Sequence, residues 1–211
     1  GGKVNIESNS AAIVISGATG GDPIVDVSAP GTTGDGGIIY IFANAGITAT
    51  GVAPAMSADS GTVEGDGGKI TLDVSGALLV LGTGETSDAK LSAKSLVSGK
   101  GGTVDITGAL GVTVKSSNIK VDGGANGKGG SILLKAPAQE LTISGEFKAN
   151  GGSGNGEGGV VTMEAGSLIL PNTSNTHIVA NGNGNGQGGT LTLNIDGDLG
   201  NGNGDGTVGL E

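Results

Sequence analysis

The chain has no cysteine and no arginine among its 211 residues, and only three of those residues are aromatic. The absence of cysteine excludes disulfides and thiolate chemistry, and it fits a protein exported through an oxidising compartment. The absence of arginine removes the guanidinium group that commonly positions or deprotonates uronates in polysaccharide lyases. With Tyr40, Phe42 and Phe147 as the only aromatic residues, we expect a core of thin aliphatic stacks.

Long apolar runs and positive charge are also scarce. The apolar runs, such as Ala77–Leu81, have the length of one strand, whereas a membrane-spanning helix needs about 20 apolar residues. Twenty carboxylates outnumber ten lysines, so the formal net charge is −10. Because such a field repels nucleic acid and anionic lipid, we expect no nucleic-acid partner and no membrane insertion.

Glycine is abundant, with 47 residues, and it is organised as a repeat. Seven Gly-Gly pairs each open the phrase Gly-Gly-x-U-x-U, in which U is apolar. The pairs lie roughly 30 residues apart, a period typical of stacked supersecondary units. They begin at Gly1, Gly36, Gly67, Gly101, Gly129, Gly158 and Gly188.

The apolar pattern of each unit predicts three short strands. The alternation after each Gly-Gly pair, as in Val104-Asp105-Ile106, indicates a strand because its period is two. A second strand is predicted at segments such as 141–143, and a third and shorter one at segments such as 147–149. The third strand always closes on Val or Ala, which predicts a corner with little room.

Equivalent strands of successive units should pair side by side, about 4.8 Å apart. The sequence therefore predicts an all-β fold: a single-stranded right-handed parallel β-helix (β-solenoid) of about seven coils, each with three strands. The right hand is expected because parallel crossovers are right-handed. Residues 1–211 are predicted to be one β-solenoid domain with coils that start near residues 1, 36, 67, 101, 129, 158 and 188.

The turns of the predicted coils differ in how much they vary. The third turn, before each Gly-Gly pair, keeps a nearly constant length, and we expect its Asn and Gly residues to supply positive-φ conformations. The residue just before the pair changes among Asp, Lys, Glu and Gln, which cannot share one ligand role. We therefore expect no metal site, no cofactor and no catalytic residue there.

The second turn varies in length from unit to unit, and functional variation in repeat proteins commonly gathers on such an edge. Glu85, Asp88, Asn172 and His177 are therefore the candidates for ligand contacts. Tolerance of loop insertions explains the same variation without any ligand.

The carboxylates on the strands do not favour an enzyme. Glycoside hydrolysis needs two acidic groups that converge in a cleft. Asp26, Asp73 and Asp105 do not occupy one equivalent position in neighbouring units, and no long loops are available to wall a cleft. We therefore expect that the chain is not an enzyme.

Two phrases carry a family resemblance: Gly127-Lys128-Gly129-Gly130-Ser131-Ile132-Leu133-Leu134 and Gly156-Glu157-Gly158-Gly159-Val160-Val161-Thr162-Met163. With their Gly-rich corners, they resemble the repeats of filamentous-haemagglutinin-type exoproteins of two-partner secretion systems. The resemblance implies a secreted or surface-tethered bacterial rod used in adhesion, biofilm or surface architecture. The Asn-Pro-Asn-type motifs of the family's secretion domain are not present, so its secretion residues cannot be carried over.

Two functions follow as expectations. The first is a structural or adhesive segment of a secreted or cell-surface β-helical fibre. Its partners would be further solenoid, by end-to-end self-association or continuation of the same coil, and a host or matrix glycan or protein receptor. The alternative is a glycan-binding or glycan-processing β-helix that acts on extracellular polysaccharide.

Overall fold

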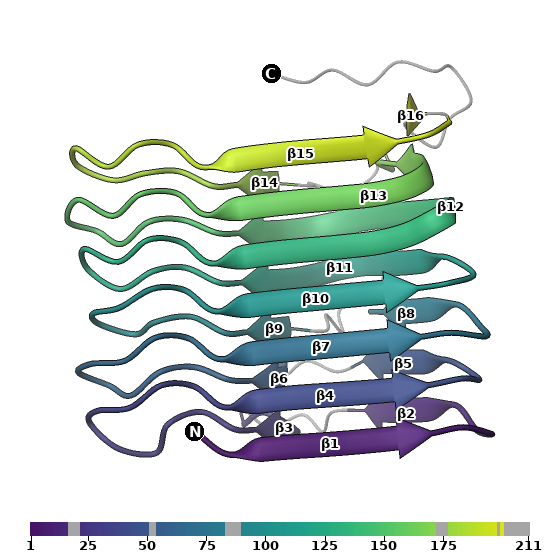
Figure 1. Cartoon of the computed structure of the whole chain (residues 1–211), viewed down its shortest axis with the longest axis horizontal. Coiled ribbons are helices and arrows are strands. Elements are labelled where there is room, and N and C mark those ends of the chain that lie inside the picture. Colours follow the sequence, from purple (N-terminus) through teal and green to yellow (C-terminus); the bar gives the residue numbers. More distant parts are fainter. Residues whose placement is uncertain (17–21, 51–53, 83–89, 172–176, 198, 201–211) are drawn as a thin grey trace.

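The computed structural model describes the whole chain except residues 17–21, 51–53, 83–89, 172–176, 198 and 201–211. The described residues form strands and turns, and none of them belongs to a helix long and apolar enough to cross a membrane. The strands are parallel and stack along one axis as a β-solenoid (Figure 1).

The described strands occupy three faces, which we name the first, second and third sheets. The first sheet contains β1 (Lys3–Ser8), β4 (Ile38–Ala43), β7 (Lys69–Val74), β10 (Thr103–Gly108), the start of β12 (Ser131–Lys148), the start of β13 (Val160–Ile169) and β15 (Thr190–Ile195). The second contains β2 (Ile13–Ser16), β5 (Ile47–Thr50), β8 (Leu79–Leu81), the start of β11 (Val112–Lys120), the middle of β12, the end of β13 and β16 (Leu199–Gly200). The third contains β3 (Val25–Asp26), β6 (Pro54–Ser57), β9 (Lys90–Ser92), the ends of β11 and β12, and β14 (His177–Val179).

The predicted fold class and hand are confirmed. In Figure 1 the chain runs left to right along the front sheet, returns behind it and rises with each coil, which is a right-handed path. The solenoid amounts to about five turns, slightly fewer than the seven coils predicted. Seven copies of the first strand stack, but the seventh unit adds only β15 and the two-residue β16 to the described residues.

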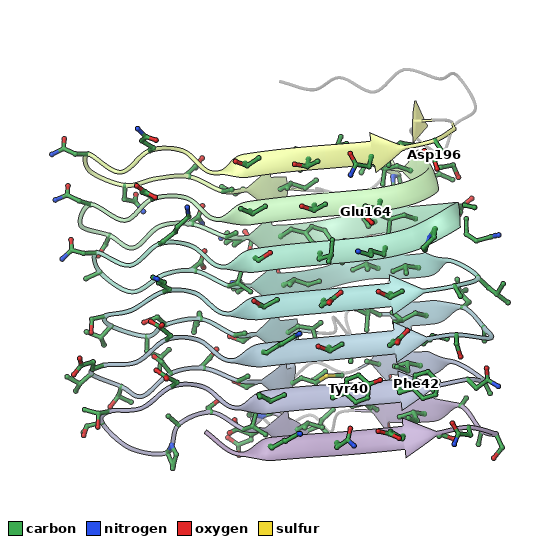
Figure 2. The ribbon with its side chains drawn as sticks, viewed as in Figure 1. Tyr40, Phe42, Glu164 and Asp196 are labelled. Atoms are coloured by element: carbon green, nitrogen blue, oxygen red, sulfur yellow. The ribbon has the colours of Figure 1, made fainter. Side chains whose placement is uncertain are left out.

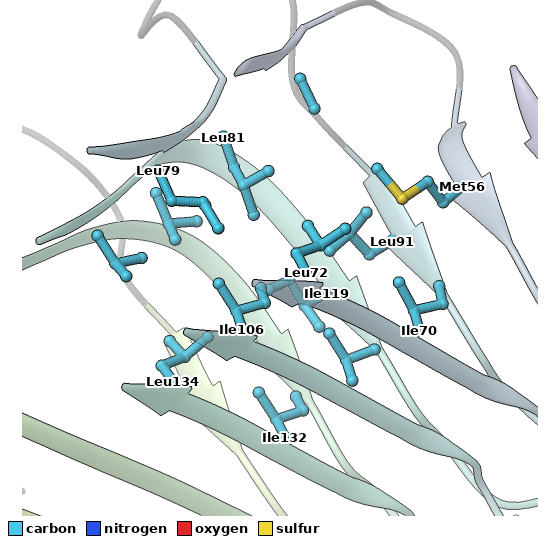
Figure 3. Close-up of a cluster of buried hydrophobic side chains, with 14 of the residues drawn as sticks. Met56, Ile70, Leu72, Leu79, Leu81, Leu91, Ile106, Ile119, Ile132 and Leu134 are labelled. Carbon is cyan, nitrogen blue, oxygen red and sulfur yellow. The ribbon is translucent and has the colours of Figure 1, made fainter. Parts of the chain in front are cut away.

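The interior is filled by columns of aliphatic side chains, one from each coil. Val104 pairs in register with Ile132, and Ile132 with Val161, and all three side chains are fully buried. Figure 3 shows the same arrangement for Ile70, Leu72 and their neighbours inside the coil. Stacking removes apolar surface from water at every step, so each coil is stabilised by its neighbours and not by a core of its own.

The Gly-Gly pairs exist because two stretches of backbone meet there. The N–H of the second glycine donates to the carbonyl of the last small residue after the third strand, at 2.6 to 2.8 Å in each coil, as Gly130 does to Val121. A Cβ on the first glycine would collide with the equivalent carbonyl of the next coil, as Gly129 would with Ala149, and a Cβ on the second would collide with the glycine of the preceding coil. The prediction of a cramped corner after the third strand is confirmed.

The expectation that Asn residues adopt positive φ in the third turn is wrong. Among the described residues, the only non-glycine with positive φ is Ala138, which lies outside these turns. In the third turns positive φ falls on Gly34, Gly65, Gly99 and Gly184. The Asn side chains have a different role, which the geometry of the turns makes plain below.

Gly129→Ala should destabilise the fold, because the added methyl group would collide with the Ala149 carbonyl. We expect a loss of about 1–3 kcal/mol in the free energy of unfolding, the usual cost of overpacking. Gly188→Ala is the matched control, since Gly188 has the same place in its unit and no described atom within 4 Å of the added Cβ. Urea unfolding followed by far-UV circular dichroism measures both, and equal losses would contradict the backbone-contact explanation.

Candidate functional site

The structure does not describe the side chains of the four candidate residues from the sequence. Glu85, Asp88 and Asn172 lie outside the described residues, and His177 is described only as the first residue of β14. Residues 83–89 lead directly into β9, and residues 172–176 lead directly into β14. Both segments are therefore followed directly by strands of the third sheet, and the outward face of that sheet is the described surface to consider.

A groove of about 430 Å³ lies on that outward face. Inward side chains such as Leu91, Ile119 and Phe147 fill the core, so the residues between them point outward. Lys90, Asn118 and Glu146 form one column in register, and Ser92, Lys120 and Lys148 form the next. The groove is lined by Lys90, Leu91, Ser92, Lys94, Asn118, Lys120 and Glu146.

This surface, which we call the lysine groove, is positive on an acidic protein. Lys90, Lys94, Lys120 and Lys148 are four of the ten lysines of the chain. Glu146 bridges two of them, with its carboxylate 2.6 Å from Lys148 Nζ and 3.5 Å from Lys120 Nζ. The Lys148 hydrogen bond, with smaller contributions from the charges of Lys148 and Lys120, holds the pKa of Glu146 below its usual value, against the opposing effect of burial.

Beside the groove, the first residue of each third turn takes part in a ladder that runs along the solenoid axis. Asp122 Oδ1 accepts from the backbone N–H of Asn150 at 2.8 Å, and Asn150 Oδ1 accepts from Asn181 N–H at 2.9 Å. Asp59 Oδ1 accepts in the same way from Lys94 N–H at 2.9 Å. Lys94 has no acceptor to offer the next coil, so this turn ladder is interrupted there.

Two shorter ladders lie further along the same turns. In one, Asp35 accepts from Asp66 N–H and Asp66 from Lys100 N–H, at 2.9 and 2.7 Å. In the other, Asn126 accepts from Asn155 N–H and Asn155 from Asn185 N–H, both at 3.0 Å. The Asp and Asn side chains of the third turns thus satisfy the backbone of the next coil, which the sequence analysis missed. Aligning the units on their Gly-Gly pairs brings the Asp or Asn residues of each of the two shorter ladders to one position, and that alignment is the signal that would have found them.

Asp122→Ala should lower the free energy of unfolding by about 0.5–1.5 kcal/mol, because the half-buried Asn150 N–H loses its acceptor. Asp122→Asn keeps an oxygen in place and should cost clearly less. Chemical unfolding of both variants gives the comparison. If the asparagine variant were as unstable as the alanine variant, charge and not the ladder would explain the effect.

The outward face of the first sheet carries two aromatic side chains and a group of carboxylates beside them. Tyr40 and Phe42 point outward from β4 (Figure 2), and the carboxylates of Glu7 and Asp73 flank Phe42 in register. Burial, then the charge of Asp105, raises the pKa of Asp73. Burial, then the charges of Asp73 and Glu7, raises the pKa of Tyr40. Ionised carboxylates therefore repel one another on this face.

The acidic residues considered for hydrolysis do not share one column. Asp105 lies opposite Thr71, whereas Asp73 lies opposite Thr107, so the two carboxylates are diagonal neighbours. Asp26 lies on the third sheet and accepts a hydrogen bond from Ser28 N–H. Within the described ranges, no three His, Asp or Glu side chains gather in an arrangement that could hold a metal ion.

Asp73→Asn should stabilise the protein at neutral pH. Because the folded state raises this pKa, it binds the proton more tightly than the unfolded state, so the ionised carboxyl lowers stability above that pKa. The gain should disappear as the pH falls below the usual value of 3.8, where the wild-type carboxyl is also neutral. Thermal unfolding across pH measures this, and a neutral-pH loss of stability in the variant would contradict it.

No protein-family model, no curated protein and no solved structure matches the chain.

Proposed function

We propose that the chain is a structural and adhesive segment of a secreted or cell-surface bacterial fibre, without enzymatic activity. The observation that carries the proposal is the continuous stacking of one three-stranded unit along the described chain, with the strands of the first sheet paired in register. The resemblance to filamentous-haemagglutinin-type repeats supports the same function. A rod of this kind displays its outward side chains at fixed intervals, which suits repeated contact with a surface.

The energetics of the turns support a durable rod. Within the described residues, every buried side-chain nitrogen and oxygen has a hydrogen-bond partner. The turn ladders, and bonds from the first glycine of each pair such as Gly129 N–H to the Glu157 carbonyl, add hydrogen bonds between coils at the corners. Such a rod resists local opening because each turn is held by the next.

Apolar side chains that are partly exposed at both ends of the stack support further solenoid as a partner. Leu191 of β15 occupies the column of the buried Val161, yet 44% of Leu191 is exposed. At the other end, Val4 and Ile6 of β1 are only partly buried. We propose that another coil covers these side chains, either by continuation of the same rod or by end-to-end association.

The proposal is tested by locating the native protein in its source cells. Antibodies raised against this chain should detect it in the medium or on intact cells, and electron microscopy should show thin rods. Antibody labelling of permeabilised cells alone would place the protein inside the cell and refute the fibre. A cytoplasmic marker protein controls for cell lysis.

The alternative function is glycan binding. The specific observation in its favour is the lysine groove, which joins ammonium, amide, hydroxyl and carboxylate groups in one concave surface. Hydroxyl groups of a sugar can donate to Glu146 and accept from Asn118 or a lysine. Binding of purified chain to a glycan panel separates this function from a purely structural one.

A further inference from the structure

We propose that the lysine groove binds an acidic polysaccharide, with uronate carboxylates placed against Lys90, Lys94 and Lys120. The inference rests on the glycan-binding function proposed above, and it names the class of glycan. It starts from the distribution of charge. A chain with a net charge of −10 repels polyanions over most of its surface, yet four of its ten lysines gather on three successive coils.

The groove keeps a positive surplus after its internal ion pairs are formed. Among the described residues that line it, Glu146 is the only carboxylate, and Glu146 is shared by Lys120 and Lys148. The carboxylate nearest to Lys94 along the turn, Asp59, accepts from the Ser92 hydroxyl at 2.6 Å and from the Lys94 backbone N–H at 2.9 Å. No described carboxylate lies within ion-pair distance of the ammonium groups of Lys90 and Lys94.

The mixture of groups favours an acidic sugar over a nucleic acid. A carboxylate in the middle of the groove repels a phosphate backbone, whereas a sugar hydroxyl can donate to it. The chain has no arginine for bidentate phosphate contacts, and no aromatic residue lines the groove for base stacking. A uronate unit offers both the carboxylate for the lysines and the hydroxyls for Glu146 and Asn118.

The geometry favours a polymer over a single anion. The two outward columns run along the solenoid axis, and each coil adds a step of about 4.8 Å, close to the length of one extended sugar unit. An extended peptide advances only about 3.3 Å per residue, so it would fall out of step with the coils. Several weak ion pairs in sequence give a polymer useful affinity, whereas one exposed pair contributes little.

The test is a calorimetric titration of the purified chain with oligogalacturonate, with a neutral galactan oligosaccharide of the same length as reference. We expect saturable binding of the acidic oligosaccharide that weakens as salt rises. Lys90→Gln with Lys120→Gln should reduce its affinity about tenfold, as expected for two charge-assisted contacts. Lys3→Gln with Lys69→Gln is the matched control: it makes the same change in net charge on the first sheet and should leave affinity nearly unchanged.

A further variant separates binding from folding. Lys94→Asn removes a groove lysine and also supplies the missing acceptor of the turn ladder toward Asp122. It should therefore unfold at higher urea concentration than the wild type and yet bind oligogalacturonate more weakly. A gain in stability with unchanged binding would remove Lys94 from the proposed site.

The remaining outcomes are distinct. Equal binding of both oligosaccharides, unaffected by the groove variants, would keep glycan binding but overturn the acidic specificity. Binding of neither oligosaccharide would contradict the inference, and an unresponsive wider glycan panel would then also refute the glycan-binding function. Tighter binding of a short DNA duplex, lost in the Lys90 and Lys120 variant, would show a polyanion site of a different class and overturn the inference.

Discussion

The close contact of successive backbones at the Gly-Gly corner is the constraint on which the rest of the structure depends. At the pairs between stacked coils, such as Gly129-Gly130, a side chain larger than hydrogen on either glycine would separate the coils or open the corner. Because the contact recurs once per unit, it fixes the register of the first strand and therefore the side of the sheet on which each side chain lies. The core columns and the outward columns are both consequences of that register.

Once the register is fixed, residues far apart in sequence become neighbours along the axis. Lys90, Lys120 and Lys148 meet on one face although they belong to three units. Asp59, Asp122 and Asn150 likewise each present a side-chain oxygen to a backbone N–H of the next coil. Stability and surface chemistry thus have the same origin: residues at equivalent positions of neighbouring coils lie side by side along the axis.

Much of the fold could be predicted from the sequence because its main signal is local. The alternation around Val104 and Ile106 specifies a strand and its buried face, and the recurrence of that phrase specifies the stacking. The reason for the glycines could not be derived in the same way. Their φ angles are ordinary at the pairs, and only the neighbouring coil shows that the limit is steric.

The surface was harder to predict because its meaning depends on pairing between units. The loop residues Glu85 and Asp88 attracted attention through loop length, a local property. The lysines were overlooked, since nothing within one unit marks Lys120 as the neighbour of Lys148 and Glu146. Within one unit, an Asn in a glycine-rich turn indicates a positive φ of its own backbone, whereas Asn150 accepts a hydrogen bond from the next coil.

The most direct test of the account is disulfide trapping between neighbouring coils, which is unambiguous because the chain has no cysteine of its own. Thr71 and Asp105 lie opposite one another in β7 and β10, whereas Thr71 and Thr107 are out of register by two residues. The account predicts that Thr71→Cys with Asp105→Cys forms a disulfide readily under mild oxidation, while Thr71→Cys with Thr107→Cys does not. Efficient trapping of the second pair and not the first would contradict the register, and with it the stacking on which every surface column depends.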